Sequence, residues 1–168
     1  MIRPKGMTPA MFESWIRACF YAEVSPDRVT QTIGNAKASA GYHAKDGQIT
    51  INGAVKINYC AAVDFSVRGL TRSQIKKLLE NLAKQGWVAW FRDWEGNEHI
   101  HAVYVGIYMK PQLAAQVIDF LNDRTGLAGH AKEKFYTAPT SLDKPLAQAF
   151  VRANPAYKKK VPAYLLEV

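Results

Sequence analysis

The fold class is decided by residues 87–105, which read WVAWFRDWEGNEHIHAVYV. Aromatic and β-branched residues are concentrated at both ends of this stretch, and such residues favour extended strands. The Glu95-Gly96-Asn97 segment between them is typical of a turn. The pattern predicts an antiparallel β-hairpin with strands at 87–93 and 99–105.

The residues before this hairpin also have strand patterns. Residues 48–57 contain Asn52-Gly53, a pair typical of tight two-residue turns, so they predict a second hairpin. Residues 59–67 predict a further strand whose side chains alternate between two faces. One face is apolar, and the other consists of Cys60, Ala62, Asp64 and Ser66. This second face is small and polar, so it leaves space above the strand.

Several other segments have apolar residues at helical spacing. The predicted helices are 9–20 after the cap Thr8, 26–40 after the cap Ser25, 72–85 after the capping box at Thr71, 111–123, and 142–153. The capping box pairs Thr71 with Gln74, and Gly86 ends that helix. The closing stretch around Val161 is predicted to be irregular.

These elements predict an α+β fold with a mainly antiparallel sheet and flanking helices, because hairpins dominate over crossovers. The 168 residues suffice for a single domain, 1–168, with one core. Within it we expect N-terminal helices in 1–38, a metal-site core in 39–106, and a C-terminal helix and tail in 107–168.

Composition excludes several classes of protein. The chain is 48% hydrophobic and 11% aromatic, which is typical of a folded protein and not of a disordered one. No apolar run is long enough for a membrane span. Charged residues such as Glu13 and Arg17 interrupt the first apolar segment, so we expect synthesis in the cytoplasm without a signal peptide. Cys19 and Cys60 are too few for a disulfide framework and are predicted to be buried.

The formal net charge of +8 favours an anionic partner. Nucleic acid, an anionic membrane surface and a bacterial cell wall all meet that description. Part of the charge lies in Lys158-Lys159-Lys160, which we interpret as a solvated segment.

The β-rich middle contains the residues that suggest chemistry. His99 and His101 are two apart on a strand and therefore share a face. Asp64 on an apolar strand is costly unless it is paired, hydrogen-bonded or bound to a metal. Histidine and carboxylate ligands suit zinc, whose catalytic sites use three protein ligands and one open position. His43, Asp64 and His101 are the candidate ligands for Zn2+.

Three nearby residues are candidate catalytic groups. Glu98 lies three residues before His101, and a carboxylate beside an activated water can accept its proton. Arg92 on the neighbouring strand is a candidate for stabilising an oxyanion. His99 is a candidate for a second stabilising group or for a partner of a ligand.

Simpler interpretations of the same residues remain open. A His-x-His pair is often structural or exposed, and Asp64 alternatively pairs with Arg68 or Arg92. His130 is interpreted as a helix-end or surface residue. Trp94 at the hairpin end is the better candidate for a substrate contact, whereas Trp87, Trp90 and Phe91 are predicted to be core residues.

Three blocks taken together, SAGYH at 39–43, YCAAVD at 59–64 and EHIH at 98–101, resemble the zinc D-Ala-D-Ala carboxypeptidase-like family. That family includes vancomycin-resistance D,D-dipeptidases and phage L-Ala-D-Glu endolysins, and it shares its fold with hedgehog signalling domains. The resemblance covers about residues 36–106. It implies a hedgehog/DD-peptidase-like fold, zinc ligands at His43, Asp64 and His101, and a catalytic Glu98. The 20 residues 44–63 replace a shorter linker of the family, and we expect this insertion to lie above the site.

The leading hypothesis is a zinc metallopeptidase that cleaves a D-Ala-D-Ala or L-Ala-D-Glu type bond in peptidoglycan, as a phage or prophage lysis enzyme or an exported effector would. The first alternative is an inactive cell-wall or protein-binding module on the same fold. The second is a basic nucleic-acid-binding domain that uses the lysine-rich segment with Tyr157 and Tyr164. We expect a peptidoglycan partner, no nucleic acid and no membrane span.

Overall fold

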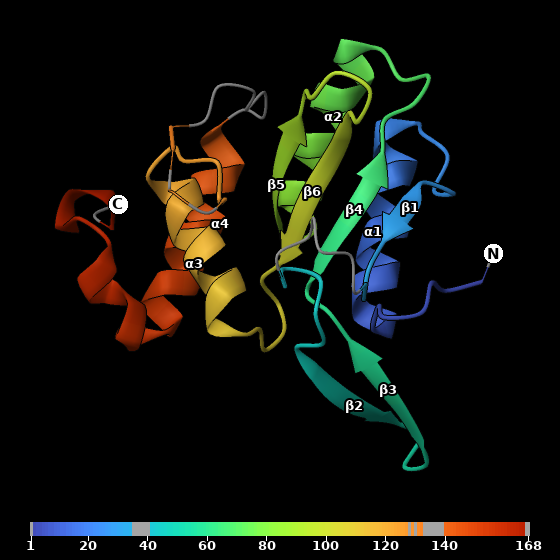
Figure 1. Cartoon of the computed structure of the whole chain (residues 1–168), viewed down its shortest axis with the longest axis horizontal. Helices are drawn as coiled ribbons and strands as arrows, with labels where there is room; N and C mark the ends of the chain where they lie inside the picture. Colours follow the sequence, from blue (N-terminus) through green and yellow to red (C-terminus); the bar gives the residue numbers. More distant parts are fainter. Residues whose placement is uncertain (1, 35–40, 128, 130, 133–139, 167–168) are drawn as a thin grey trace.

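The computed structural model describes residues 2–34, 41–127, 129, 131–132 and 140–166. Its centre is a four-stranded sheet with strand order β1-β4-β6-β5 (Figure 1). The strands are β1 (Val29–Gln31), β4 (Ala62–Ser66), β6 (His99–Tyr104) and β5 (Trp87–Arg92). All neighbouring strands pair antiparallel, and helices lie on both sides of the sheet. The predicted α+β class with a mainly antiparallel sheet is therefore confirmed.

The β5–β6 hairpin has the register that the sequence predicts. Arg92 lies opposite His99, and Trp87 lies opposite Tyr104. On the other side of β6, Asp64 of β4 lies directly opposite His101. Cross-strand neighbours of this kind project from the same face of a sheet. The sheet thus places the Asp64 and His101 side chains next to each other.

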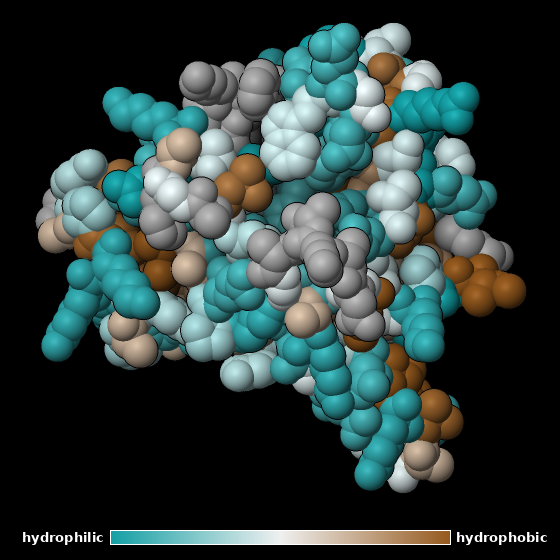
Figure 2. Space-filling view, viewed as in Figure 1, coloured by the Kyte–Doolittle hydropathy of each residue, from teal (hydrophilic) through white to brown (hydrophobic). Residues whose placement is uncertain are grey.

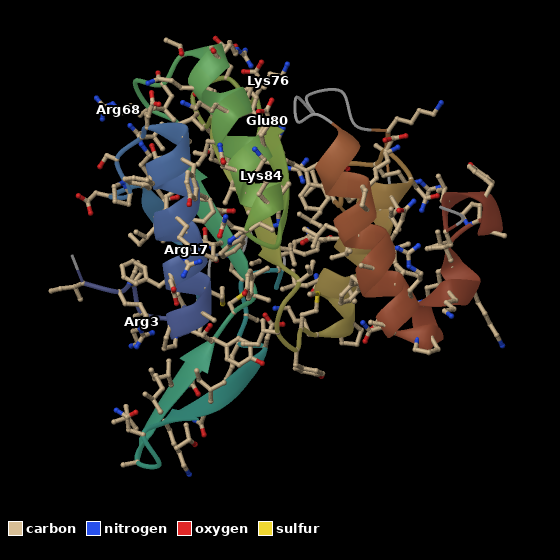
Figure 3. The ribbon with its side chains drawn as sticks, turned by 180° about the vertical axis from the view of Figure 1, so that it is seen from behind. Arg3, Arg17, Arg68, Lys76, Glu80 and Lys84 are labelled. Carbon is tan, nitrogen blue, oxygen red and sulfur yellow. The ribbon has the colours of Figure 1, made fainter. Side chains whose placement is uncertain are left out.

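Helices α1 (Pro9–Ala22) and α2 (Arg72–Lys84) cover one face of the sheet. Thr8 caps α1 by accepting a hydrogen bond from the Met11 amide at 3.2 Å. Thr71 and Gln74 form the predicted capping box. The outward faces of the two helices carry charged side chains, among them Arg17, Lys76, Glu80 and Lys84 (Figure 3).

Phe65 lies at the centre of the core beneath these helices. Its ring stacks on Trp15 with the centroids 3.7 Å apart, and Trp87 meets it edge-on at 5.8 Å. All three side chains are buried. Trp87, Trp90 and Phe91 are core residues, as predicted, and Cys19 and Cys60 are buried free thiols. Burial raises the pKa of each thiol to about 12.

We expect Phe65→Ala to lower the free energy of unfolding by about 3–5 kcal/mol, because it leaves a cavity between two tryptophans. Urea unfolding followed by tryptophan fluorescence measures the change. Phe20→Ala on α1 is the control, since Phe20 is 75% exposed and its loss should change stability by less than about 0.5 kcal/mol. Equal effects of the two substitutions would contradict this account of the core.

Helices α3 (Pro111–Leu121) and α4 (Thr140–Ala153) pack together beside β5 (Figure 1). Their apolar side chains, among them Val117 and Phe120 of α3, form a second cluster with residues of the sheet such as Trp90 and Val103. Two short 3-10 helices follow, η2 (Pro155–Lys160) and η3 (Ala163–Leu165), where the sequence predicts irregular structure. Lys158, Lys159 and Lys160 are exposed, as predicted. Within the described residues, no helix is both long enough and apolar enough to span a bilayer.

Strands β2 (Gly47–Ile51) and β3 (Val55–Tyr59) form a separate hairpin that projects from the end of the sheet (Figure 1). Its turn is the predicted Asn52-Gly53 pair, and both residues have positive φ values, 50° and 71°. Positive φ values at both turn residues match the twist of the two flanking strands, which explains why Asn-Gly predicts a tight hairpin turn.

The predicted helix at 26–40 is wrong where the structure describes it. Val29–Gln31 is instead the edge strand β1, paired with β4. The Ser25-Pro26 start signal is local, whereas the pairing with β4 is a long-range contact that overrides it. Residues 35–40 lie outside the described part of the chain. The described residues of the 1–38 unit, 2–34, therefore hold one α-helix and a strand, not two helices.

Candidate metal centre

His43, Asp64 and His101 meet on the sheet face opposite α1 and α2. One potential ligand atom from each lies within 4.8 Å of the others. Asp64 and His101 come from β4 and β6, and His43 comes from the loop before β2. His43 and His101 are buried, and the Asp64 side chain is 14% exposed. The structure thus brings together the three residues that the sequence predicts as ligands.

The Asp64 carboxylate bridges the two imidazoles. Its Oδ1 lies 2.8 Å from His101 Nδ1, and its Oδ2 lies 3.1 Å from His43 Nε2. Burial alone would raise the pKa of Asp64, but hydrogen bonds with His101 and His43 outweigh it and hold the pKa well below its usual range. Burial lowers the pKa of His101, against the opposing effect of Asp64. A carboxylate and a neutral imidazole are the protonation states that bind metal ions.

In each imidazole, the ring nitrogen that points away from Asp64 also makes a hydrogen bond. His43 Nδ1 donates to the Thr32 carbonyl at 2.9 Å. His101 Nε2 donates to Gln116 Oε1 at 3.1 Å, and Gln116 Nε2 in turn donates to the Gly126 carbonyl at 2.8 Å. In the metal-free protein, the ring nitrogen that faces Asp64 donates a hydrogen bond to the carboxylate. A bound metal ion would replace that proton, while the outer bonds keep the proton on the other nitrogen and fix the orientation of each ring.

This donor set fits a metal ion. Two imidazole nitrogens and a carboxylate converge on one point, and a cation between them satisfies all three groups. Two imidazoles and one carboxylate are a ligand set found in zinc sites. The alternative that Asp64 pairs with an arginine is not needed, because both of its oxygens face histidines.

The centre opens into a groove of about 890 Å³ whose lining includes all three candidate ligands. Hydrophilic residues dominate this face of the molecule (Figure 2). Other lining residues are Arg68, Arg72, Trp94, Glu98 and His99. The predicted substrate contact, Trp94, therefore lies along the groove. No residue of β2 or β3 is among the lining residues, so the expectation that the insertion lies above the site is wrong.

Glu98, the candidate proton acceptor, and His99, the candidate stabilising group, both line the groove. His99 is on the same face of β6 as His101, and its Nδ1 donates to the Asn97 carbonyl at 2.8 Å, so in the neutral imidazole Nε2 is the nitrogen that can accept a proton. Glu98 is exposed in the turn before β6. It precedes the first residue of β6 and lies at the rim of the groove, among the lining residues. The catalytic role of Glu98 stays a prediction.

Arg92 is buried, and its guanidinium is held by other parts of the protein. It donates a hydrogen bond to the Thr125 carbonyl and lies over the rings of Trp90 and Trp94. Arg92 is not among the residues that line the groove. Arg92 thus packs against Trp94, which lines the groove. A direct role for Arg92 in stabilising an oxyanion stays a prediction.

Sequence reasoning missed Thr32 and Gln116, which orient the two histidines. Gln116 is 1% exposed on α3, a helix whose buried residues are mostly apolar. A polar residue at such a position was the available signal, because buried amides need partners. Thr32 acts through its backbone carbonyl, which leaves no trace in the side-chain pattern. His130 lies outside the described residues.

Comparisons of this chain with protein-family models, with curated proteins and with solved structures give no match, so the inferences about function below come from the site itself and from the sequence motifs.

Proposed function

We propose that this protein is a zinc-dependent peptidase that hydrolyses peptidoglycan stem peptides. The observation that carries the proposal is the buried His43–Asp64–His101 cluster, with its ring orientations fixed, at an open groove. The hedgehog/DD-peptidase-like fold implied by the sequence motifs belongs to this proposal. A net charge of +8 fits an anionic cell wall.

The residues divide the chemistry between them. His43, Asp64 and His101 hold the metal, which lowers the pKa of a water molecule and polarises the scissile carbonyl when it is bound. His99 Nε2 is placed to accept a proton at the groove, and Glu98 on the adjacent turn is the second candidate. Trp94 offers an aromatic surface to the substrate.

The test combines elemental analysis with digestion of purified muropeptides. We expect one zinc per chain, and release of D-Ala or cleavage between L-Ala and D-Glu, detected by mass spectrometry. Removal of the metal with a chelator should stop the reaction, and added zinc should restore it. No bound metal and no zinc uptake on titration would reject the proposal.

Two observations favour a second candidate, a metal-containing binding module without hydrolysis. Glu98 is exposed in the turn before β6, and Arg92 donates a hydrogen bond to the Thr125 carbonyl. Zinc binding with intact muropeptides after long incubation, together with retention of the protein on peptidoglycan sacculi, would support the binding module.

A further inference from the structure

The loop that carries His43 is clamped on both sides of this residue by one lysine. Lys110 Nζ donates to the Tyr42 carbonyl at 3.0 Å and to the Ala44 carbonyl at 2.7 Å. Its third contact is Asp46 Oδ1 at 3.3 Å. An ammonium group has three donors, and all three are directed at this loop.

Asp46 fastens the same loop to the sheet. Its side chain is fully buried. Oδ2 accepts a hydrogen bond from the Ala61 amide at 2.6 Å, and Oδ1 accepts one from the Lys110 amide at 2.8 Å. Ala61 directly precedes β4, which carries Asp64. Asp46 thus ties the loop of His43 to the strand of the second candidate ligand.

These bonds also close the base of the inserted hairpin. The Asp46 amide donates to the Tyr59 carbonyl at 2.9 Å, so the chain leaves for β2 and returns from β3 at one point. Beyond that point the hairpin projects away from the sheet (Figure 1). The hydrogen bonds of Asp46 therefore anchor the chain between the hairpin and His43.

We infer that Lys110 and Asp46 are positioning residues for His43, and that they make metal binding independent of the β2–β3 hairpin. The inference rests on the metal centre of the proposed function. It explains how His43 stays beside Asp64 although 20 residues separate the two in the chain. Lys110 also begins α3, the helix that carries Gln116, so a single helix holds both histidines.

The main experiment is a double-mutant cycle on zinc affinity, measured by competition with a chelator on the full chain. Lys110→Met should lower the affinity about 10- to 100-fold, as loss of an outer partner does. His43→Ala should lower it further, and adding Lys110→Met to His43→Ala should then have no additional effect. Additive losses would overturn the inference, because Lys110 would then act independently of His43.

Two variants of the hairpin serve as matched controls. Lys56→Met removes an exposed lysine of β3. A shortened chain replaces residues 49–57 with a two-residue Asn-Gly turn. Both should bind zinc as tightly as the wild type. A loss of affinity in the shortened chain would show that the hairpin supports the site, which contradicts the inference.

The ring of His43 gives a readout that does not depend on metal. In the zinc-free wild type, 15N NMR should show a proton on His43 Nδ1, which donates to the Thr32 carbonyl, and Lys110→Met should change the signals of this ring. Unchanged signals would overturn the inference even if the wild type bound no zinc and the proposed function failed. Lys110→Gln, which keeps a neutral donor for the two carbonyls, is the variant to use if Lys110→Met does not fold. It should lower the zinc affinity by an intermediate amount. An unchanged affinity and an unchanged spectrum would again overturn the inference.

Discussion

Asp64→Ala should lower the zinc affinity by more than about 100-fold and abolish hydrolysis. Loss of an outer partner of a ligand already lowers metal affinity about 10- to 100-fold, and Asp64 is itself a candidate ligand. Both imidazoles have one nitrogen within hydrogen-bonding distance of its carboxylate, at 2.8 Å for His101 and 3.1 Å for His43. Without it, two neutral nitrogens are left to bind a dication, and nothing balances its charge.

Ser66→Ala is the matched control for this prediction. Ser66 lies two residues along the same strand face and lines the same groove. Zinc titration of both variants, with circular dichroism to verify the fold, should give a loss for Asp64→Ala alone. If Asp64→Ala binds zinc as tightly as the wild type, the metal does not bind at this cluster, and the proposed peptidase loses its main support.

His99→Ala should lower kcat by about 10²- to 10⁴-fold, which is the contribution of a positioned general base. His99 shares the site face of β6 with His101, and the bond from Nδ1 to the Asn97 carbonyl makes Nε2 the accepting nitrogen of the neutral imidazole. Because His99 is not among the clustered ligands, the zinc content should stay at the wild-type level. Steady-state kinetics on a purified muropeptide, with elemental analysis of the same sample, measure both quantities.

Glu98→Gln distinguishes the two candidate bases. Since Glu98 is exposed in the turn, we expect its loss to lower kcat less than the loss of His99. The reverse order would identify Glu98 as the base, as the family resemblance implies, and would require the turn to move when substrate binds. If both His99→Ala and Glu98→Gln keep full activity, another group must transfer the proton.

Elements whose signals lie within a few residues were predictable from the sequence. The Thr71–Gln74 capping box, the Asn52-Gly53 turn and the hairpin at 87–105 each form through contacts between neighbours in the chain. The clustering of the three candidate ligands was also predictable. It followed from strand alternation for Asp64 and from the family motifs for His43 and His101.

Features that depend on distant partners were not predictable. Strand β1 forms because it pairs with β4 at the edge of the sheet. The residues just before it, Ser25 and Pro26, carry a helix-start signal instead. Asp46 and Gln116 looked like ordinary polar residues. Their roles depend on Ala61, Lys110 and Gly126, which fold against them from elsewhere in the chain.

Because Asp64 pairs directly with His101, a zinc ion bound as proposed would report the alignment of β4 with β6. A slip of one residue between β4 and β6 would turn one of these side chains toward the apolar face covered by α1 and α2. Only the native alignment then binds the ion, and at a concentration 100 times the Kd binding would favour that alignment by about 2.7 kcal/mol. Zinc supply would in this way select among the folded forms of the chain, and protein made under zinc starvation should contain more misaligned sheet.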